Sequence, residues 1–155
     1  MSIEDDIAFL QAVPILQVLG GDALRIIAIG AENKDVQDGE ILFQRGDASD
    51  AGYLILEGSF TLSAVPDDPA RDMVAERGTL LGELALIKDM PRAVTATARE
   101  SSTVMRIPRS LFLKMLEGYP QAAHRLREML VTRTRDTMGE VAKVRSTLHN
   151  IEKKS

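Results

Sequence analysis

The sequence predicts an α+β fold, in which an antiparallel β-roll (a double-stranded β-helix, jelly-roll-like) has N-terminal helices before it and a long C-terminal helix after it. Three observations support this: a helical apolar pattern over residues 3–29, many short strand-like runs separated by glycines in the middle, and a second helical pattern after Pro108. With 155 residues, 45% of them apolar, the chain is large enough to bury one hydrophobic core.

The first helical section, Ile3 to Ile29, is interrupted by Pro14 and by Gly20-Gly21, so we expect more than one helix there. The strand-like runs that follow are rich in Val, Ile, Leu and Thr. They are separated by the turn Pro66-Asp67-Asp68-Pro69 and by glycines, namely Gly39, Gly46, Gly58, Gly78 and Gly82. Residues 93–98 alternate, so every second side chain there should face the core or a pocket.

Gly118-Tyr119-Pro120 predicts a break between a short helix and a long one of about 30 residues. We therefore expect residues 1–120 to form the β-roll with its flanking helices, and residues 121–155 to form the long C-terminal helix, serving as a lid or for dimerisation. Its apolar or small stripe is Ala123, Leu126, Leu130, Thr134, Thr137, Val141, Val144, Leu148 and Ile151.

That stripe fits an amphipathic helix lying on its own domain, which is the commoner arrangement, or a coiled-coil-like seam between two copies. A helix of ~45 Å is longer than a small roll can cover. The sequence analysis therefore favours a homodimer through this helix.

Charge and composition exclude several classes of protein. Residues 1–120 carry 11 Lys or Arg against 19 Asp or Glu, whereas residues 121–155 carry 8 against 4. The acidic body should therefore repel DNA, and only the basic tail has the charge to contact nucleic acid, so we do not expect DNA recognition by this chain alone. The absence of cysteine excludes disulfides and cysteine-held clusters. No apolar run is long enough to span a membrane, and the acidic start is unlike a signal peptide, so we expect a cytoplasmic protein without membrane contact.

The segment with the most chemical information is Gly82-Glu83-Leu84-Ala85-Leu86-Ile87-Lys88-Asp89-Met90-Pro91-Arg92-Ala93. Gly82 allows a tight turn before a helical turn, whose first amides can attract an anion. Arg92 can add a charge-assisted contact to a phosphate, and Glu83 can accept a hydrogen bond from a ribose hydroxyl. Alone, Arg92 would be a surface arginine and Glu83 a helix-end charge; together they favour a 3′,5′-cyclic nucleotide.

This segment resembles the phosphate-binding cassette of cyclic-nucleotide-binding domains, which occur in cAMP-dependent kinase regulatory subunits, nucleotide-gated channels and Crp/Fnr-type, or catabolite-activator-type, regulators. Two upstream motifs, residues 38–47 and 53–58, extend the resemblance to roughly residues 7–120. It implies that Glu83 holds the ribose 2′-OH, that Arg92 pairs with the phosphate, and that the amides of Ala85 and Ala93 bond phosphate oxygens.

The resemblance also implies a ligand preference. Relatives selective for cGMP commonly carry a hydroxyl residue at the position of Ala93, so we expect cAMP to be the preferred ligand and cGMP to bind more weakly. The ligand-binding residues expected from the sequence are Gly82, Glu83, Leu84, Ala85, Arg92 and Ala93. The loop before Tyr53 lacks the aromatic residue that commonly stands there in the family.

Three functional classes follow from these observations. The leading one is a stand-alone cAMP sensor that switches helix or partner contacts, is not an enzyme, and acts on an effector protein that the sequence does not identify. The second is a Crp/Fnr-type transcription regulator without its helix-turn-helix domain, and the third is a ligand-free interaction scaffold. His124 and His149 lack the spacing of metal ligands, so we expect no metal.

Overall fold

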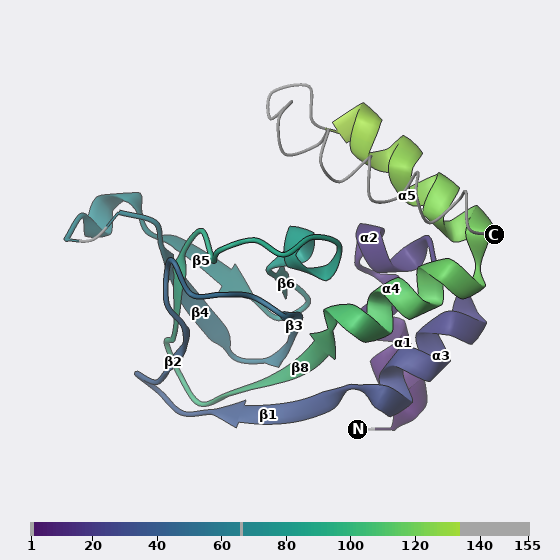
Figure 1. The fold of residues 1–155 in the computed structure, drawn as a ribbon. Helices are drawn as coiled ribbons and strands as arrows, with labels where there is room; N and C mark the ends of the chain where they lie inside the picture. The colour runs from purple at the N-terminus through teal and green to yellow at the C-terminus, as the bar shows by residue number, and fades with distance from the viewer. Residues whose placement is uncertain (1, 66, 134–155) are drawn as a thin grey trace.

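The computed structural model describes residues 2–65 and 67–133 and shows an antiparallel β-roll with its helices gathered on one side (Figure 1). Two four-stranded antiparallel sheets form the roll, with strand orders β1-β8-β3-β6 and β2-β7-β4-β5. The strands are β1 (Glu32–Val36), β2 (Ile41–Phe43), β3 (Ala51–Glu57), β4 (Ser59–Ser63), β5 (Met73–Glu76), β6 (Leu80–Leu81), β7 (Thr95–Ala98) and β8 (Ser102–Pro108). The predicted fold class is confirmed.

Three helices precede the roll, as the interrupted pattern predicts: α1 (Ile3–Gln11), α2 (Pro14–Gln17) and α3 (Gly21–Gly30). The first begins with a capping box, in which the Ser2 hydroxyl accepts from the Asp5 amide and the Asp5 carboxylate accepts from the Ser2 amide. Pro14 occupies the first turn of α2, where its missing N–H costs no helical hydrogen bond. Gly20, at φ +85°, turns the chain into α3.

Strands β3 and β8 form a wall between two hydrophobic cores. They pair antiparallel, with Leu54 opposite Met105, and both of these side chains face the core that the helices cover. The next residues along each strand, Ile55 and Val104, face the other core, inside the roll. Because alternate strand side chains point to opposite faces, one wall supports both cores.

The predicted strand over residues 93–98 is shorter than expected, since β7 covers only Thr95–Ala98, but its alternation is confirmed because Ala96 and Ala98 are buried inside the roll. Two short 3₁₀ helices interrupt the strands. One is η1 (Pro69–Arg71), in the turn between β4 and β5, and the other is η2 (Glu83–Leu86), directly after β6. Leu86 of η2 is fully buried in the helix-covered core, so η2 lies where the roll meets the helices.

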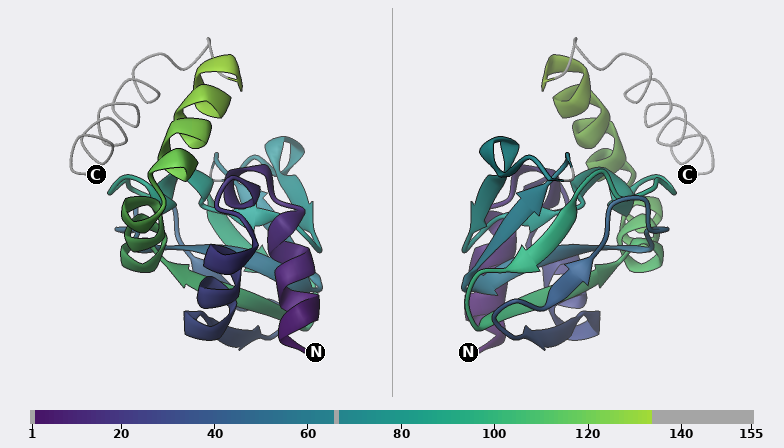
Figure 2. Two further views of the ribbon diagram at one scale, coloured as in Figure 1. Left: turned by 90° about the vertical axis from the view of Figure 1, so that its right-hand side faces the viewer. Right: turned by 90° about the vertical axis from the view of Figure 1, so that its left-hand side faces the viewer.

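After the roll come α4 (Arg109–Gly118) and α5 (Pro120–Arg133), which are separated at Tyr119 as predicted (Figure 2). Ala123, Leu126 and Leu130 of α5 are buried in the same core as α1 and α3. The prediction that these residues face a second chain is therefore wrong for the described part of the helix, which lies on its own domain. The rest of the stripe, from Thr134 to Ile151, and the predicted length of the helix lie outside the described residues.

Within the described ranges, none of the helices has the length and apolarity that crossing a membrane requires.

We predict that Leu126→Ala lowers the free energy of unfolding by about 2–5 kcal/mol, because it leaves a cavity in the shared core. Val131→Ala is the matched control on the same helix, since Val131 is 39% exposed, and it should have a small effect. Denaturant unfolding at two protein concentrations provides the measurement. A Leu126→Ala loss that depended on protein concentration would place this side chain between chains instead.

Candidate functional site

Gly82 turns the chain sharply at the start of the predicted cassette. Its φ of +76° lies in the left-handed region, where a side chain would be strained, and the turn leads directly into η2. This confirms the predicted glycine turn before a helical turn. The Ala85 amide, which the family resemblance implies is a phosphate donor, donates here to the carbonyl of Gly82 over 3.0 Å. A phosphate contact from Ala85 therefore requires this bond to open or to be shared.

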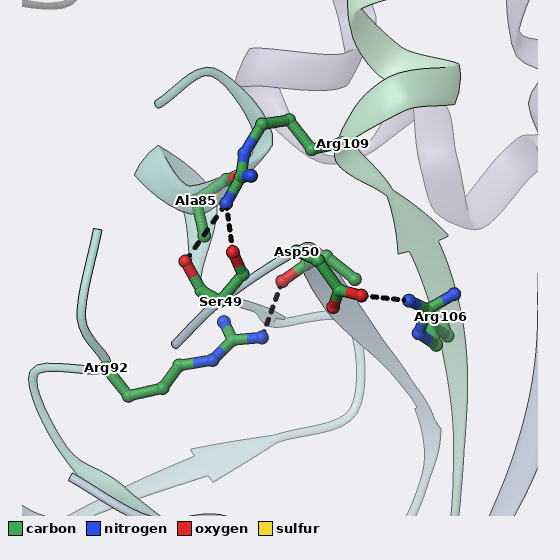
Figure 3. Close-up of polar contacts among 7 residues, drawn as sticks. Ser49, Asp50, Ala85, Arg92, Arg106 and Arg109 are labelled. Atoms are coloured by element: carbon green, nitrogen blue, oxygen red, sulfur yellow. Dashed lines mark hydrogen bonds and ion pairs between the residues drawn. The ribbon is translucent and has the colours of Figure 1, made fainter. Parts of the chain in front are cut away.

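Arg92 is the most unusual group in the site, because its side chain is only 6% exposed and yet incompletely paired. Its Nη2 donates to the carbonyl of Ala51 over 2.8 Å (Figure 3), whereas Nε and Nη1 are buried without a hydrogen-bond partner. Buried polar atoms of native proteins are nearly always paired. Two unused cationic donors therefore indicate a place for an acceptor that is not part of the described chain.

The surroundings of Arg92 affect its pKa in opposing directions. Burial lowers the pKa of the guanidinium, and the positive charge of Arg109 adds to the lowering, whereas Tyr53, Asp50 and Asp47 raise it. An arginine keeps its proton even so, because its ordinary pKa is very high. The site thus holds a desolvated positive charge with a second cation nearby, which an anion would stabilise.

Two aromatic rings support the Arg92 guanidinium from inside the roll. Its central carbon lies 4.3 Å from the ring centre of Phe43 on β2 and 5.5 Å from that of Tyr53 on β3. The two rings also stack on each other, with centroids 5.9 Å apart. The attraction of a cation for aromatic faces stabilises the buried charge and fixes the plane of the guanidinium without using its N–H donors. Neither ring was assigned to the site from the sequence.

Gly82 and Arg92, both predicted as ligand-binding residues, lie against each other. A Cβ built on Gly82 would overlap Nη1 of Arg92. The glycine is therefore needed both for its backbone angle and for the space that the arginine occupies.

The other predicted residues lie around this pair. Glu83 and Leu84 are half-buried at the start of η2, Ala85 is buried, and Ala93 is exposed. The cassette backbone is tied to the turn after β2, because the Arg92 amide donates to the carbonyl of Asp47 and the Gly46 amide donates to the carbonyl of Arg92, each over 2.8 Å. The residues predicted from the local sequence therefore lie together around Gly82 and Arg92.

A second arginine, Arg109 at the first position of α4, joins the segments on either side of Arg92 (Figure 3). Its Nε donates to the carbonyl of Ala85 in η2 over 2.7 Å, and its Nη2 donates to the carbonyl and the hydroxyl of Ser49. The Ser49 hydroxyl donates in turn to the carbonyl of Met90. The sequence analysis missed Arg109 and Ser49 because they lie 60 residues apart and belong to no local motif.

Gly52, directly before Tyr53, lies close to η2. A Cβ on Gly52 would lie 3.1 Å from Cγ of Leu86, tighter than an ordinary contact. The missing side chain lets η2 lie close on β3. A Cβ at this position would require the Leu86 side chain to give by a few tenths of an ångström.

Comparisons with known proteins agree with this geometry. The family model described as "Cyclic nucleotide-binding domain" matches residues 33–119. The cAMP-dependent protein kinase regulatory subunit of Dictyostelium discoideum is 30% identical over 122 residues, which cover 76% of this chain and 37% of that protein. The chain spans well under half of the curated relatives that it matches, from 7% to 37% of their length.

Two solved structures are similar over most of their length. A cyclic nucleotide-binding-like protein from Brucella abortus shares 34% identity at a TM-score of 0.65, with 73% of this chain and 98% of that chain covered. The N-terminal domain of a transcriptional regulator from Streptomyces coelicolor shares 25% identity at a TM-score of 0.72, with 84% and 93% covered. With its β-roll, its glycine turn and its buried arginine, this chain belongs to the cyclic nucleotide-binding domain family, a regulatory domain that also occurs within enzymes such as lysophospholipases.

Proposed function

We propose that this chain is a cAMP-preferring sensor domain that changes helix or partner contacts when the nucleotide binds. The observation that carries the proposal is the buried guanidinium of Arg92, whose Nε and Nη1 have no partner and whose Nη1 lies against Gly82. A cyclic phosphate supplies the missing acceptors and the negative charge together. The relative from Dictyostelium is named as a regulatory subunit of a cAMP-dependent kinase, which supports cAMP as the first ligand to test.

In this proposal each cassette residue has a separate role. Arg92 pairs with the phosphate while Nη2 keeps its bond to the Ala51 carbonyl, and Glu83 accepts a hydrogen bond from the ribose 2′-OH. The amides of Ala85 and Ala93 donate to phosphate oxygens, which for Ala85 means releasing or sharing the bond to Gly82. Gly82 and Leu84 shape the turn that brings these groups together.

The path from ligand to output runs through η2. Leu86 and the following Ile87 are buried in one core with Phe112 and Leu116 of α4. A movement of η2 toward the phosphate would alter this packing, because close-packed interiors do not deform continuously. We propose that α4 and α5 carry the signal to an effector protein.

Homodimerisation remains part of the proposal only through residues 134–155, since Leu126 and Leu130 are already buried within their own chain. Sedimentation with and without saturating cAMP tests it. If the chain sediments as a monomer at high protein concentration both with and without saturating cAMP, the dimer is refuted.

A ligand-free scaffold is the second candidate, and one observation favours it. Arg92 already rests on Phe43 and Tyr53 and bonds the Ala51 carbonyl, so its charge is partly stabilised without a ligand. The two unpaired donors weigh against it, because leaving a buried charged group incompletely bonded costs stability.

The first binding prediction concerns Arg92. Arg92→Ala should weaken cAMP binding by about 2–5 kcal/mol, the usual loss on removing one partner of a buried charge pair. Calorimetric titration measures this loss. Arg99→Ala is the control, because Arg99 is exposed and lies outside the cassette, and it should leave the affinity unchanged. Wild-type protein that binds no cAMP would support the scaffold instead.

A pair of glycine variants separates backbone strain from the site itself. Gly82→Ala and Gly78→Ala both place a side chain at positive φ and should each cost about 1–2 kcal/mol of stability. Only at Gly82 would the new Cβ meet Arg92, whereas the space around Gly78 is open. We therefore expect Gly82→Ala alone to weaken cAMP binding, by about tenfold or more. Equal affinities of the two variants in calorimetry would contradict the proposed contact.

Base preference is tested at Ala93, which is exposed beside Arg92. We expect cAMP to bind more tightly than cGMP by about 1 kcal/mol, and Ala93→Thr to narrow that gap, because a hydroxyl can bond the guanine amino group and a methyl cannot. Competition of each nucleotide against a fluorescent cyclic nucleotide measures the gap. The preference is refuted if wild-type protein binds cGMP more tightly.

A further inference from the structure

We propose that Arg109 is a positioning residue for the nucleotide site, one that holds η2 and the segment 49–51 at the first turn of α4 and thereby ties the movement of the cassette to the helices. This inference rests on the proposed function for the identity of the ligand. The anchoring of η2 by Arg109 can nevertheless be tested in ligand-free protein.

Arg109 bridges two segments that are distant in the sequence. From the start of α4, its Nε reaches the carbonyl of Ala85 in η2, over 2.7 Å, and its Nη2 reaches Ser49, whose hydroxyl is 3.1 Å away. The planar guanidinium presents its donors in a fixed fork, so bonding one segment orients the donors to the other. Arg109 therefore fixes the position of η2 relative to the segment before β3.

The same short segment also connects Arg109 to Arg92. Its three successive carbonyls accept hydrogen bonds from these two residues. The Ser49 carbonyl accepts from the Arg109 side chain, and the Ala51 carbonyl accepts from Arg92 Nη2 over 2.8 Å (Figure 3). The Asp50 carbonyl accepts from the Arg109 amide over 2.8 Å. A shift of the Arg92 side chain toward a ligand would therefore pull on the segment 49–51, which Arg109 bonds to the start of α4.

The position of Arg109 in its helix is electrostatically unfavourable. It is the first residue of α4, where a positive charge opposes the helix dipole, and Pro108 before it provides no side-chain cap. Helix formation alone would favour an acidic residue here. The bonds to Ala85 and Ser49 offset this cost, which supports a positioning role rather than a purely local one.

Arg106 on β8 offers a matched control. Its Nη2 donates to the carboxylate of Asp50 over 2.8 Å, so it also contacts the segment 49–51 (Figure 3). That contact is with an exposed side chain, in contrast to the backbone carbonyls that Arg109 bonds. Removing Arg106 thus removes a nearby arginine while η2 keeps its anchor.

The first experiment uses ligand-free protein and hydrogen exchange of the amides that donate to carbonyls of Gly82 and η2, those of Ala85 within η2 and of Ile87 and Lys88 directly after it. Arg109→Met keeps the length of the side chain but removes its donors, and we expect exchange to rise by about tenfold, whereas Arg106→Met should stay within about twofold. Arg109→Lys retains the charge without the fork and should also exchange faster than wild type. Exchange in both Arg109 variants equal to that of wild type would overturn the inference.

The second experiment titrates the same variants with cAMP in a calorimeter. Arg109→Met should bind about tenfold more weakly and Arg106→Met about as tightly as wild type. If Arg109→Met does not fold, as judged by thermal unfolding, Arg109→Lys carries the comparison. Failure of wild type to bind cAMP would refute the proposed function, and the exchange result would still decide the role of Arg109. If the Arg109 variant binds cAMP as tightly as wild type does, and its amides in and directly after η2 exchange at the wild-type rate, the positioning role is refuted and the proposed function stands.

Discussion

The structure of the site depends on how one buried positive charge is accommodated. The Arg92 guanidinium is buried beside the Phe43 ring and close to Gly82, and its Nη2 donates a hydrogen bond to the carbonyl of Ala51. Desolvation makes this arrangement costly, so an anionic ligand has a strong advantage there. The glycine turn, the aromatic pair and the backbone ties of the cassette all serve to keep the charge in this place.

The roll places this charge where a ligand can influence the helices. Strands β3 and β8 face the roll interior on one side and the helix-covered core on the other, and η2 contributes Leu86 to the latter. The cassette and the helices therefore meet at one short helical turn. Polar contacts from Arg109 and apolar contacts from Leu86 join the same turn to α4, so two kinds of interaction connect the site to the C-terminal part of the chain.

Local sequence patterns predicted the fold class and the pairing of Gly82 with Arg92, because both depend on residues close together in the chain. Gly82 and Arg92 are ten positions apart, and the glycine's backbone requirement is visible in the sequence. Phe43 and Arg109 were missed because only the folded roll brings them to the cassette. Leu126 was assigned to a second chain because a helical stripe gives the direction of burial but not the surface that covers it.

The most direct test of the account is the ¹⁵N–¹H resonance of Arg92 Nε, one of the two donors that lack a partner. The account predicts that titration with cAMP shifts this resonance saturably as the donor bonds a phosphate oxygen, while the side-chain resonance of the exposed Arg99 stays in place. An Arg92 resonance that remains unchanged at saturating cAMP would contradict the claim that this buried charge exists to receive the ligand.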